Sequence, residues 1–363
     1  MKVGIVGLPN VGKSTLFNCL SQSKAQSENY PFCTIDPNVS IVNVPDLRLN
    51  KLNELINPEK LIPTTVKIVD IAGLVKGASK GEGLGNKFLS NIRETDAIIH
   101  VLRCFDDPNI VHVDGKINPL SDKEVVEYEL VLKDIEILDK RLDKIKKTLR
   151  SGSDESKKEI EVLEKVRSQL ENMSVKIDDY SEDQFLGFIK PLELISFKPI
   201  LYVCNVNEND VINGNSYVDD VKNQIKLNDS EVIIISAKIE SEINELDSFE
   251  EKKIFLDDLG LKESGSNKLI RASYKLLNLH SYFTAGDKEV RGWTIRIGDS
   301  AYDAAGQIHT DFQKGFICAE VINYNDYIEF GSESKVKEAG KMRLEGKEYI
   351  VADGDIMHFR FNI

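Results

Sequence analysis

The nine residues GLPNVGKST at positions 7–15 constrain the fold of this chain more than any other segment. They match the phosphate-binding loop pattern G-x-x-x-x-G-K-[ST] and directly follow the apolar run VGIV. Gly7 and Gly12 lack Cβ, so the loop can adopt the positive φ angles that turn backbone N–H groups onto phosphate oxygens. A helix is expected from about Lys13, with apolar residues at Leu16, Phe17 and Leu20 and its N-terminus directed at the same phosphates. The pattern therefore predicts a P-loop α/β core that binds a nucleotide.

The loop also supplies the groups that a triphosphate and its metal ion need. Lys13 is expected to place a positive charge beside the phosphates, and Ser14 offers a hydroxyl to Mg²⁺. The expected nucleotide contacts of this segment are Asn10, Val11, Gly12, Lys13, Ser14 and Thr15.

Residues 65–73, TVKIVDIAG, have the form of the strand that precedes a γ-phosphate sensor. In P-loop proteins the Asp at the end of such a strand holds the Mg²⁺ shell, and the following Gly touches the γ-phosphate. Asp70 and Gly73 fit these roles. Thr34, in FCTIDPN, stands where a switch threonine completes the Mg²⁺ shell, although without Asp70 and Ser14 an ordinary Thr before a Pro-containing loop would be the preferred interpretation. The expected metal ligands are Ser14, Thr34 and Asp70.

The base-recognition segment decides between adenine and guanine. After the apolar strand PILYVC, residues Asn205, Val206 and Glu208 stand where a guanine-specific GTPase carries N-K-x-D. The Asp of that motif accepts hydrogen bonds from guanine and the Lys covers the base; Val206 and Glu208 change both groups. Because a site that pairs with one base rejects the other strongly, the sequence favours ATP over GTP. Ser236 and Ala237, in SAK after the strand VIIIS, match the element that closes the base pocket.

Taken in order, GLPNVGKST, FCTIDPN, DIAGLVKGASKGEGLGN, NVNE and SAK resemble the Obg-like ATPase (YchF) family of P-loop proteins. The resemblance extends across the chain. The segments KLLNLHSYFTAGDKEVRGWTIRIG, AGQIHTDFQKGFICAEV and AGKMRLEGKEYIVADGDIMHFRFN look like that family's TGS domain, a ubiquitin-like β-grasp module. The resemblance implies a Mg²⁺-dependent ATPase that uses ATP as well as or better than GTP and binds RNA of the large or small ribosomal subunit, or both. It also implies a role in translation, with links to stress responses.

The residue after the D-x-x-G pattern is Leu74, where Ras-type GTPases carry a Gln that orients the attacking water. Leu74 cannot do this, so slow intrinsic hydrolysis is expected, with the water positioned by another group, a monovalent cation or a partner. Asn10 resembles the Asn of potassium-stimulated P-loop GTPases, which implies K⁺ beside the phosphates. His112 is a candidate catalytic residue from the resemblance, against the alternative of an exposed loop histidine. With Lys13, these two residues form the expected catalytic set, whereas His100 is expected to be a packed core residue.

Residues 121–191 interrupt the α/β pattern with two helical segments whose apolar residues recur at spacings of three and four, as in a heptad pattern. The short polar link between them predicts an antiparallel helical hairpin. Residues 140–158 near its tip hold eight Lys or Arg against three acids, a net charge of +5. This charge indicates either an ordinary solvated face or a contact with the phosphates of ribosomal RNA. The apolar positions are Tyr128, Val131, Ile135, Leu138, Leu142, Ile145 and Leu149 in the first segment, and Ile160, Leu163, Val166, Leu170 and Met173 in the second.

Bulk composition agrees with a multidomain cytoplasmic enzyme. The 363 residues are enough for two or three domains, and 41% of them are hydrophobic. The five cysteines are odd in number and scattered, so neither a disulfide framework nor a zinc site is expected. The first strand is expected within a few residues of Met1, which leaves no room for a signal or transit peptide. No apolar run spans a bilayer, and the net charge of −13 argues against a general affinity for nucleic acid; neither membrane nor DNA is an expected partner.

The expected architecture is a P-loop core formed by residues 1–120 and 192–277, with the helical hairpin at 121–191 inserted between them and the β-grasp TGS domain at 278–363. Two function classes follow. One is an ATPase whose hydrolysis times release from the ribosome, and the other is a nucleotide-gated binding module in which turnover is incidental. A GTPase that tolerates NVNE is the third alternative.

Overall fold

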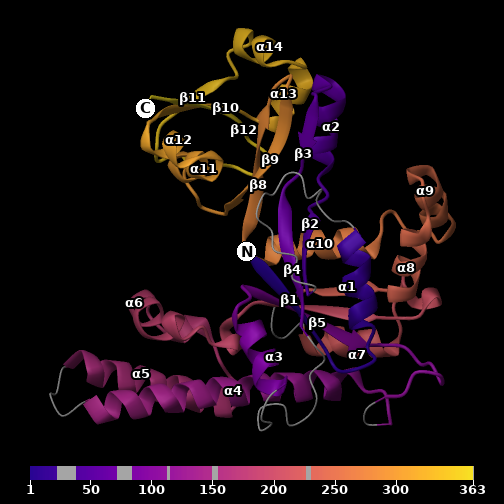
Figure 1. Ribbon diagram of the computed structural model, residues 1–363, viewed down its shortest axis with the longest axis vertical. Helices are drawn as coiled ribbons and strands as arrows, with labels where there is room; N and C mark the ends of the chain where they lie inside the picture. Colours follow the sequence, from indigo (N-terminus) through magenta and orange to yellow (C-terminus); the bar gives the residue numbers. More distant parts are fainter. Residues whose placement is uncertain (23–37, 72–83, 113–114, 149–153, 226–229, 363) are drawn as a thin grey trace. The chain divides into compact units, whose positions relative to one another are not determined.

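The computed structural model describes residues 1–22, 38–71, 84–112, 115–148, 154–225 and 230–362, with only the backbone described at 84–88 and 148. The chain divides into two compact units (Figure 1). The first contains Met1–Leu20 and Ile68–Ser266, and the second contains Ile41–Lys67 and Asn267–Ile363. The second unit thus includes a segment that the expected domain limits placed in the P-loop core.

A mostly parallel sheet with the strand order β2-β4-β1-β5-β6-β7 forms the centre of the first unit, and its edge strand β2 runs antiparallel to β4. Strands β1 (Lys2–Val6), β5 (Ala97–Arg103), β6 (Ile200–Asn205) and β7 (Val232–Ile235) pair in parallel. Every residue of β5 is buried, as expected for a strand covered on both faces. Because the carboxyl ends of parallel strands meet at one edge, the loops after β1, β5, β6 and β7 converge there. The remaining strands are β2 (Val39–Asn43) and β4 (Thr65–Asp70).

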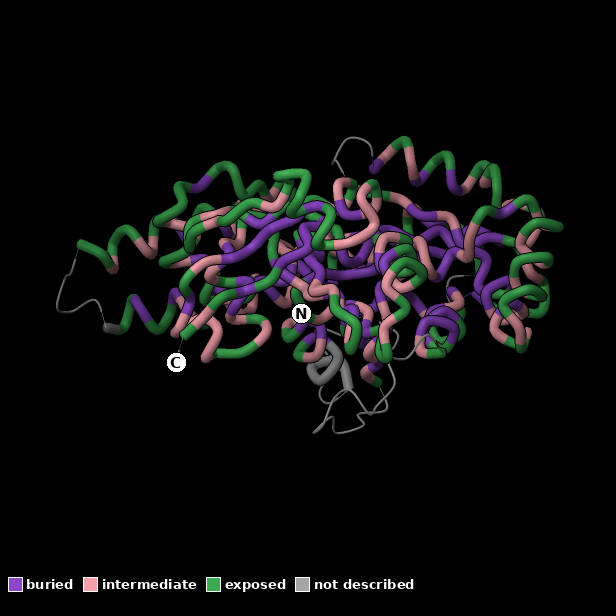
Figure 2. Tube along the Cα trace, turned by 90° about the horizontal axis from the view of Figure 1, so that it is seen from above, coloured by how far each residue is buried: buried purple, intermediate pink, exposed green. Residues whose placement is uncertain are grey.

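Helix α1 (Lys13–Gln22) begins where the P-loop pattern predicts and buries Leu16, Phe17 and Leu20. The other helices of this unit alternate with the strands, as in other doubly wound α/β folds. In Figure 2 the buried residues follow the strands, and the exposed ones follow the outer turns of the helices. Among the described residues, no helix combines the length and apolar character that crossing a bilayer requires. The helices are α3 (Leu84–Arg93), α7 (Ser216–Ile225), α8 (Ala237–Glu245), α9 (Phe249–Asp258) and α10 (Gly265–Leu276), which continues into the second unit.

The predicted helical hairpin is formed by α4 (Pro119–Thr148) and α5 (Asp154–Glu171). Leu138, Leu142, Leu163 and Val166 are among the buried residues of its apolar core, in agreement with the heptad spacing. Two of the predicted core positions were wrong. Tyr128 is exposed because the first turns of α4 bury Val126 and Leu130 and contact β5 and α7 instead of α5. Met173 is exposed because it lies past the end of α5. Leu149 lies outside the described residues.

Short helical turns lead from the hairpin to β6, and their ends are fixed by one buried carboxylate. Asp134 in α4 accepts hydrogen bonds from the backbone N–H groups of Ile195 at 2.9 Å and Ser196 at 2.7 Å. The Asp134 side chain therefore fixes to α4 the segment that leads back to the sheet. The turns span Ile177–Asp179, Glu182–Gln184 (α6), Phe185–Ile189, Lys190–Leu192 and Ile195–Phe197.

The second unit contains a sheet with the order β11-β10-β12-β8-β9-β3. Strands β8 (Leu279–Ala285) and β9 (Glu289–Arg296) form an antiparallel hairpin, and β12 (Ile356–Phe361) lies parallel to β8. Strands β10 (Phe316–Ile322) and β11 (Arg343–Glu345) continue the sheet beyond β12. Helix α11 (Ala301–Ile308) buries its alanines against this sheet, which confirms the predicted β-grasp fold. Three shorter helices are α12 (Thr310–Lys314), α13 (Tyr324–Phe330) and α14 (Glu333–Glu338).

Residues 41–67 belong to this unit for two physical reasons. Strand β3 (Lys60–Ile62) extends the sheet by pairing in parallel with β9. Helix α2 (Leu47–Ile56) buries Leu49 and Leu52 in an apolar cluster with Phe283 and other residues of the C-terminal sheet. This segment therefore packs with the C-terminal sheet, although it lies between two parts of the P-loop core in the sequence.

Candidate nucleotide-binding site

The phosphate-binding loop joins β1 to α1 and has two residues in the left-handed region. Asn10 has φ 63° and Gly12 has φ 94°. Gly12 also needs to lack a side chain, because a Cβ there would overlap the Nδ2 atom of Asn205. Gly7 differs from the expectation, since positive φ occurs at Gly12 and not at Gly7. A Cβ on Gly7 would lie 2.7 Å from the backbone oxygen of Val101, so close strand contact is what requires a glycine there.

Lys13 extends from the first residue of α1 toward the end of β4. Its ammonium donates to Asp70 Oδ1 at 2.6 Å and to the backbone oxygen of Ile71 at 2.7 Å. The Lys13 side chain is 8% exposed and the Asp70 side chain 19% exposed. The two residues that the sequence assigned to phosphate and metal binding are thus in direct contact.

The oxygen atoms near this pair suit a hard divalent cation. Asp70 supplies a carboxylate, and Ser14 supplies an exposed hydroxyl from the first turn of α1. The end of β4 lies beside the end of β1, since Ile71 N–H donates to Ile5 O at 3.3 Å. Hydroxyl and carboxylate oxygens are ligands that Mg²⁺ prefers, so these residues fit the ion that the sequence predicts. Thr34 and Gly73, also assigned to this region, lie outside the described residues.

Asn205, the last residue of β6, connects the P-loop to the start of α8. Its Nδ2 donates to the backbone oxygen of Val11 at 2.9 Å, and its Oδ1 accepts from the Ala237 N–H at 2.9 Å. Asn205 is buried, so both bonds are shielded from water. The predicted base-recognition segment is therefore fixed to the P-loop by one side-chain amide.

The neighbouring residues of NVNE and SAK take separate roles. Val206 is buried, and its N–H donates to the backbone oxygen of Ile235 at 2.8 Å. Ser236 is also buried and caps α8 by accepting from the Ile239 N–H. The carboxylate of Glu208, where a GTPase carries Asp, forms an ion pair with Lys238 of the SAK segment. Lys238 therefore lies beside the group expected to contact the base.

His112 is buried, which excludes the alternative of an exposed loop histidine. Its Nε2 lies 3.0 Å from Oδ2 of Asp122, a buried residue in the first turn of α4. Next to it in the chain, the backbone oxygen of Val111 accepts from Asn10 Nδ2 at 3.1 Å. The structure thus brings the loop that carries His112 to the P-loop residue assigned to K⁺.

Arg103, at the end of β5, is a supporting residue that the sequence reasoning missed. Its guanidinium donates to the backbone oxygens of Phe105 at 3.2 Å, Ile110 at 3.0 Å and Asp107 at 3.2 Å. It is 1% exposed and fully buried among the largest side chains of the core. The available signal was a single Arg ending the otherwise apolar strand AIIHVLR, since a buried guanidinium requires several acceptors.

His100 in the middle of β5 is a core residue, as expected. It is buried and lies 5.7 Å from the ring of Tyr202, centroid to centroid. Burial, together with the charge of Lys123, lowers the pKa of His100 to about 3. The imidazole is therefore neutral at physiological pH and takes no part in the site.

Proteins of known name match the chain over its whole length. A protein of Haemophilus ducreyi named "Ribosome-binding ATPase YchF" is 54% identical over 362 residues, covering 100% of this chain and 99% of that protein. The protein of the same name from Bacillus subtilis is 52% identical over 366 residues, covering 100% of both. The chain belongs to the YchF family. The solved structure of the Schizosaccharomyces pombe YchF GTPase is 39% identical, covers 99% of this chain and 97% of its own, and matches with a TM-score of 0.88.

Two family models agree with this placement. The model of a 50S ribosome-binding GTPase matches residues 2–165, which include the P-loop, Asp70 and His112. The model of the YchF-GTPase C-terminal domain, described as a protein of unknown function, matches residues 279–362. The second match covers the β-grasp domain of this YchF protein and leaves its role open.

Substitution of Asn205 by Ala should weaken both folding and nucleotide binding. It leaves the Val11 oxygen and the Ala237 N–H buried without their partner, at a cost of about 1–3 kcal/mol for each group. We expect a lower free energy of unfolding in urea and an ATP dissociation constant raised about tenfold or more, measured by isothermal titration. Asn207→Ala is the matched control, because Asn207 is exposed and the hydrogen bond from its side-chain amide to Asp106 O is 3.5 Å long. Equal behaviour of the two variants would contradict the bridging role.

Proposed function

We propose that this YchF-family protein is a Mg²⁺-dependent ATPase that binds ribosomes. The contact of Lys13 with Asp70, at the point where the ends of β1 and β4 meet, is the single observation that carries the nucleotide part. The ribosome part rests on relatives at 52–54% identity that are named ribosome-binding ATPases. A cytoplasmic location belongs to the same proposal, since it is where ribosomes are.

Different residues of the site would contact different parts of a bound triphosphate. Backbone N–H groups from Asn10 to Thr15 and the N-terminus of α1 bind phosphate oxygens, and Lys13 neutralises charge on the β- and γ-phosphates. Ser14 and Asp70, joined by Thr34, would hold Mg²⁺, which when bound offsets the negative charge that develops during phosphoryl transfer. Gly73 would contact the γ-phosphate through its backbone N–H.

Base selection in this proposal rests on Glu208 and its neighbours. The Glu208 carboxylate pairs with Lys238 of the SAK segment and is one methylene longer than the Asp of N-K-x-D, so it does not reproduce that Asp. Val206 is part of an apolar cluster with Val218 and Val221, so it provides no stem to cover the base. Both features support ATP as the preferred substrate and leave GTP as the weaker one.

Competition between ATP and GTP for the wild-type protein tests this preference. We expect ATP to bind more tightly, and the double substitution Val206→Lys with Glu208→Asp to shift the preference toward GTP, because it restores the guanine-reading pair. Val206 is buried, so Glu208→Asp alone is the companion variant that keeps the core intact. Tighter binding of GTP than ATP by the wild type would support the GTPase alternative that the name of the fission-yeast relative suggests.

We further propose that His112 and a K⁺ ion held near Asn10 assist hydrolysis. The Asp122 carboxylate fixes the His112 ring, and Arg103 fixes the loop that places Val111 O against Asn10. Leu74 lacks a group that orients water, so we assign that role to His112 and the ion among the residues that the structure describes. Lys13 supplies the charge on the leaving phosphates.

Turnover should therefore depend on both the cation and the histidine. For wild type we expect faster ATP hydrolysis in KCl than in matched NaCl. For His112→Ala we expect kcat to fall by about 10²-fold or more, as for loss of an acid–base group, with little change in ATP affinity. Equal rates in the two salts would remove the K⁺ proposal. An unchanged kcat, or a loss of ATP binding equal to the loss of turnover, would assign His112 a structural role.

The hairpin tip is the proposed contact with ribosomal RNA, and its charge is less available than the sequence suggests. Arg141, Lys146 and Lys157 form ion pairs with Glu159, Glu164 and Asp154 within the hairpin. Lys144 and Lys147 are exposed on the last turns of α4, and Arg150 lies outside the described residues. The proposal therefore rests on the exposure of the lysines near the end of α4, and it does not require that they are unpaired.

Reversal of Lys144, Lys147 and Arg150 to Glu should weaken co-sedimentation with ribosomes and flatten its salt dependence. Each lost phosphate contact removes roughly one unit from the slope of log affinity against log salt. ATP affinity should not change. Lys253→Glu with Lys262→Glu, two exposed lysines of the same unit, is the control. A tip variant that binds with the wild-type slope would place the ribosome contact on another face.

A hydrolysis-deficient variant tests the other alternative. If it binds ribosomes and dissociates from them as the wild type does, the nucleotide-gated binding module would be favoured.

A further inference from the structure

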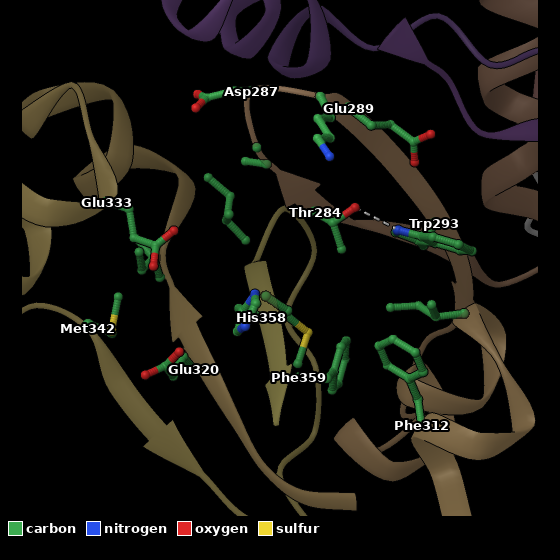
Figure 3. A pocket seen from close by; sticks show the side chains of 17 residues that line it. Thr284, Asp287, Glu289, Trp293, Phe312, Glu320, Glu333, Met342, His358 and Phe359 are labelled. Carbon is green, nitrogen blue, oxygen red and sulfur yellow. Dashed lines mark hydrogen bonds between the residues drawn. The ribbon is translucent and has the colours of Figure 1, made fainter. Parts of the chain in front are cut away.

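A cavity of about 560 Å³ opens in the β-grasp sheet of the C-terminal unit (Figure 3). Its walls are mostly apolar, with Trp293, Phe312, Met357 and Phe359 on the side that α11 covers and Met342 on the opposite side. No residue of the nucleotide site lines it. It is therefore a separate feature of the molecule that the proposed ATPase activity does not use.

The cavity lies where two central strands part. Strands β8 and β12 share one register pair, Phe283 with Ile356, and the Phe283 N–H donates to Asp355 O at 2.8 Å. Beyond this pair, Thr284 and Ala285 on one strand and Met357 to Phe359 on the other become cavity walls. Backbone groups alternate in direction along a strand, so those of Ala285 and Phe359 point into the same gap. The gap thus presents strand edges that an extended segment can pair with.

The charged residues at the cavity determine which charge a bound segment should carry. Four carboxylates line it, those of Asp287, Glu289, Glu320 and Glu333, against one lysine, Lys288. Glu320 and Glu289 form ion pairs with Arg360 and Arg291, so the excess negative charge comes from Asp287 and Glu333, which are exposed on the rim. Figure 3 shows Asp287 at the top of the view and Glu333 and Glu320 on the left, with the rings of Trp293, Phe359 and Phe312 toward the right. This charge repels phosphate groups and attracts ammonium or guanidinium groups.

We propose that this cavity binds a short extended segment of a partner protein that carries Arg or Lys beside apolar side chains. The apolar residues enter between Trp293, Phe312 and Met342, and the cationic groups pair with the carboxylates of Asp287 and Glu333. Backbone bonds to the open edges of β8 and β12 hold the segment extended. An RNA strand is the competing ligand, and the charge of the cavity opposes it.

Trp293 provides a direct signal because it is the only Trp of the chain and lies in the cavity wall. The full-length protein is titrated with the peptide acetyl-Arg-Leu-Arg-Leu-Arg-Leu-amide, with the same peptide carrying Glu in place of Arg, and with decauridylate RNA. We expect a saturable change of Trp293 fluorescence with the basic peptide alone, at a dissociation constant on the order of 10–100 µM in low salt. No saturable change with the basic peptide, or saturation with the RNA instead, would overturn the proposal.

Charge reversal locates the binding site. Asp287→Lys with Glu333→Lys should raise the dissociation constant of the basic peptide at least about tenfold, since both rim charges are inverted. Glu338→Lys with Glu348→Lys makes the same change of net charge at exposed positions that do not line the cavity, and should leave binding within about twofold of wild type. All four residues are exposed, so the core is preserved in each variant. Equal binding by the two double variants would place the peptide elsewhere.

Discussion

The nucleotide site depends on one buried amide, that of Asn205. It connects the P-loop, 194 residues earlier in the chain, to the start of α8, 32 residues later, by donating to Val11 O and accepting from Ala237 N–H. Each of these two backbone groups would be costly to bury unpaired. Gly12 must lack a side chain for this amide to approach. The phosphate-binding and base-binding ends of the site are therefore held in one geometry by two small residues.

Local sequence patterns were enough to predict most elements of the P-loop core. The P-loop, the strand ending at Asp70 and the helix from Lys13 each follow from a few adjacent residues, because the required spacing is set within one strand–loop–helix unit. The hairpin was predicted for the same reason, since a heptad pattern identifies the buried face of each helix. Its errors at Tyr128 and Met173 fall where the helix contacts something other than its partner or has already ended.

Long-range partners could not be predicted in this way. Residues 41–67 follow the P-loop in sequence, yet β3 pairs with β9, more than two hundred residues later. Short strands carry little sequence signal, and their register is decided by the sheet that accepts them. His112 was undecided because its burial depends on Asp122, a residue on α4. The cavity between β8 and β12 could not be predicted either, because no sequence pattern indicates that the pairing of these two strands ends after one register pair.

Arg103 holds the loop between β5 and α4 by donating to three main-chain oxygens, and its guanidinium also lies over the ring of Phe105. Hydrogen bonds to main-chain oxygens do not depend on which side chains the loop carries, but they do require a fixed length and path of its backbone. A side chain such as that of Asn109 can therefore change without loss of these hydrogen bonds, whereas an insertion or deletion there would carry the carbonyls out of reach. The loop can vary its surface chemistry while keeping Val111 and His112 at fixed positions.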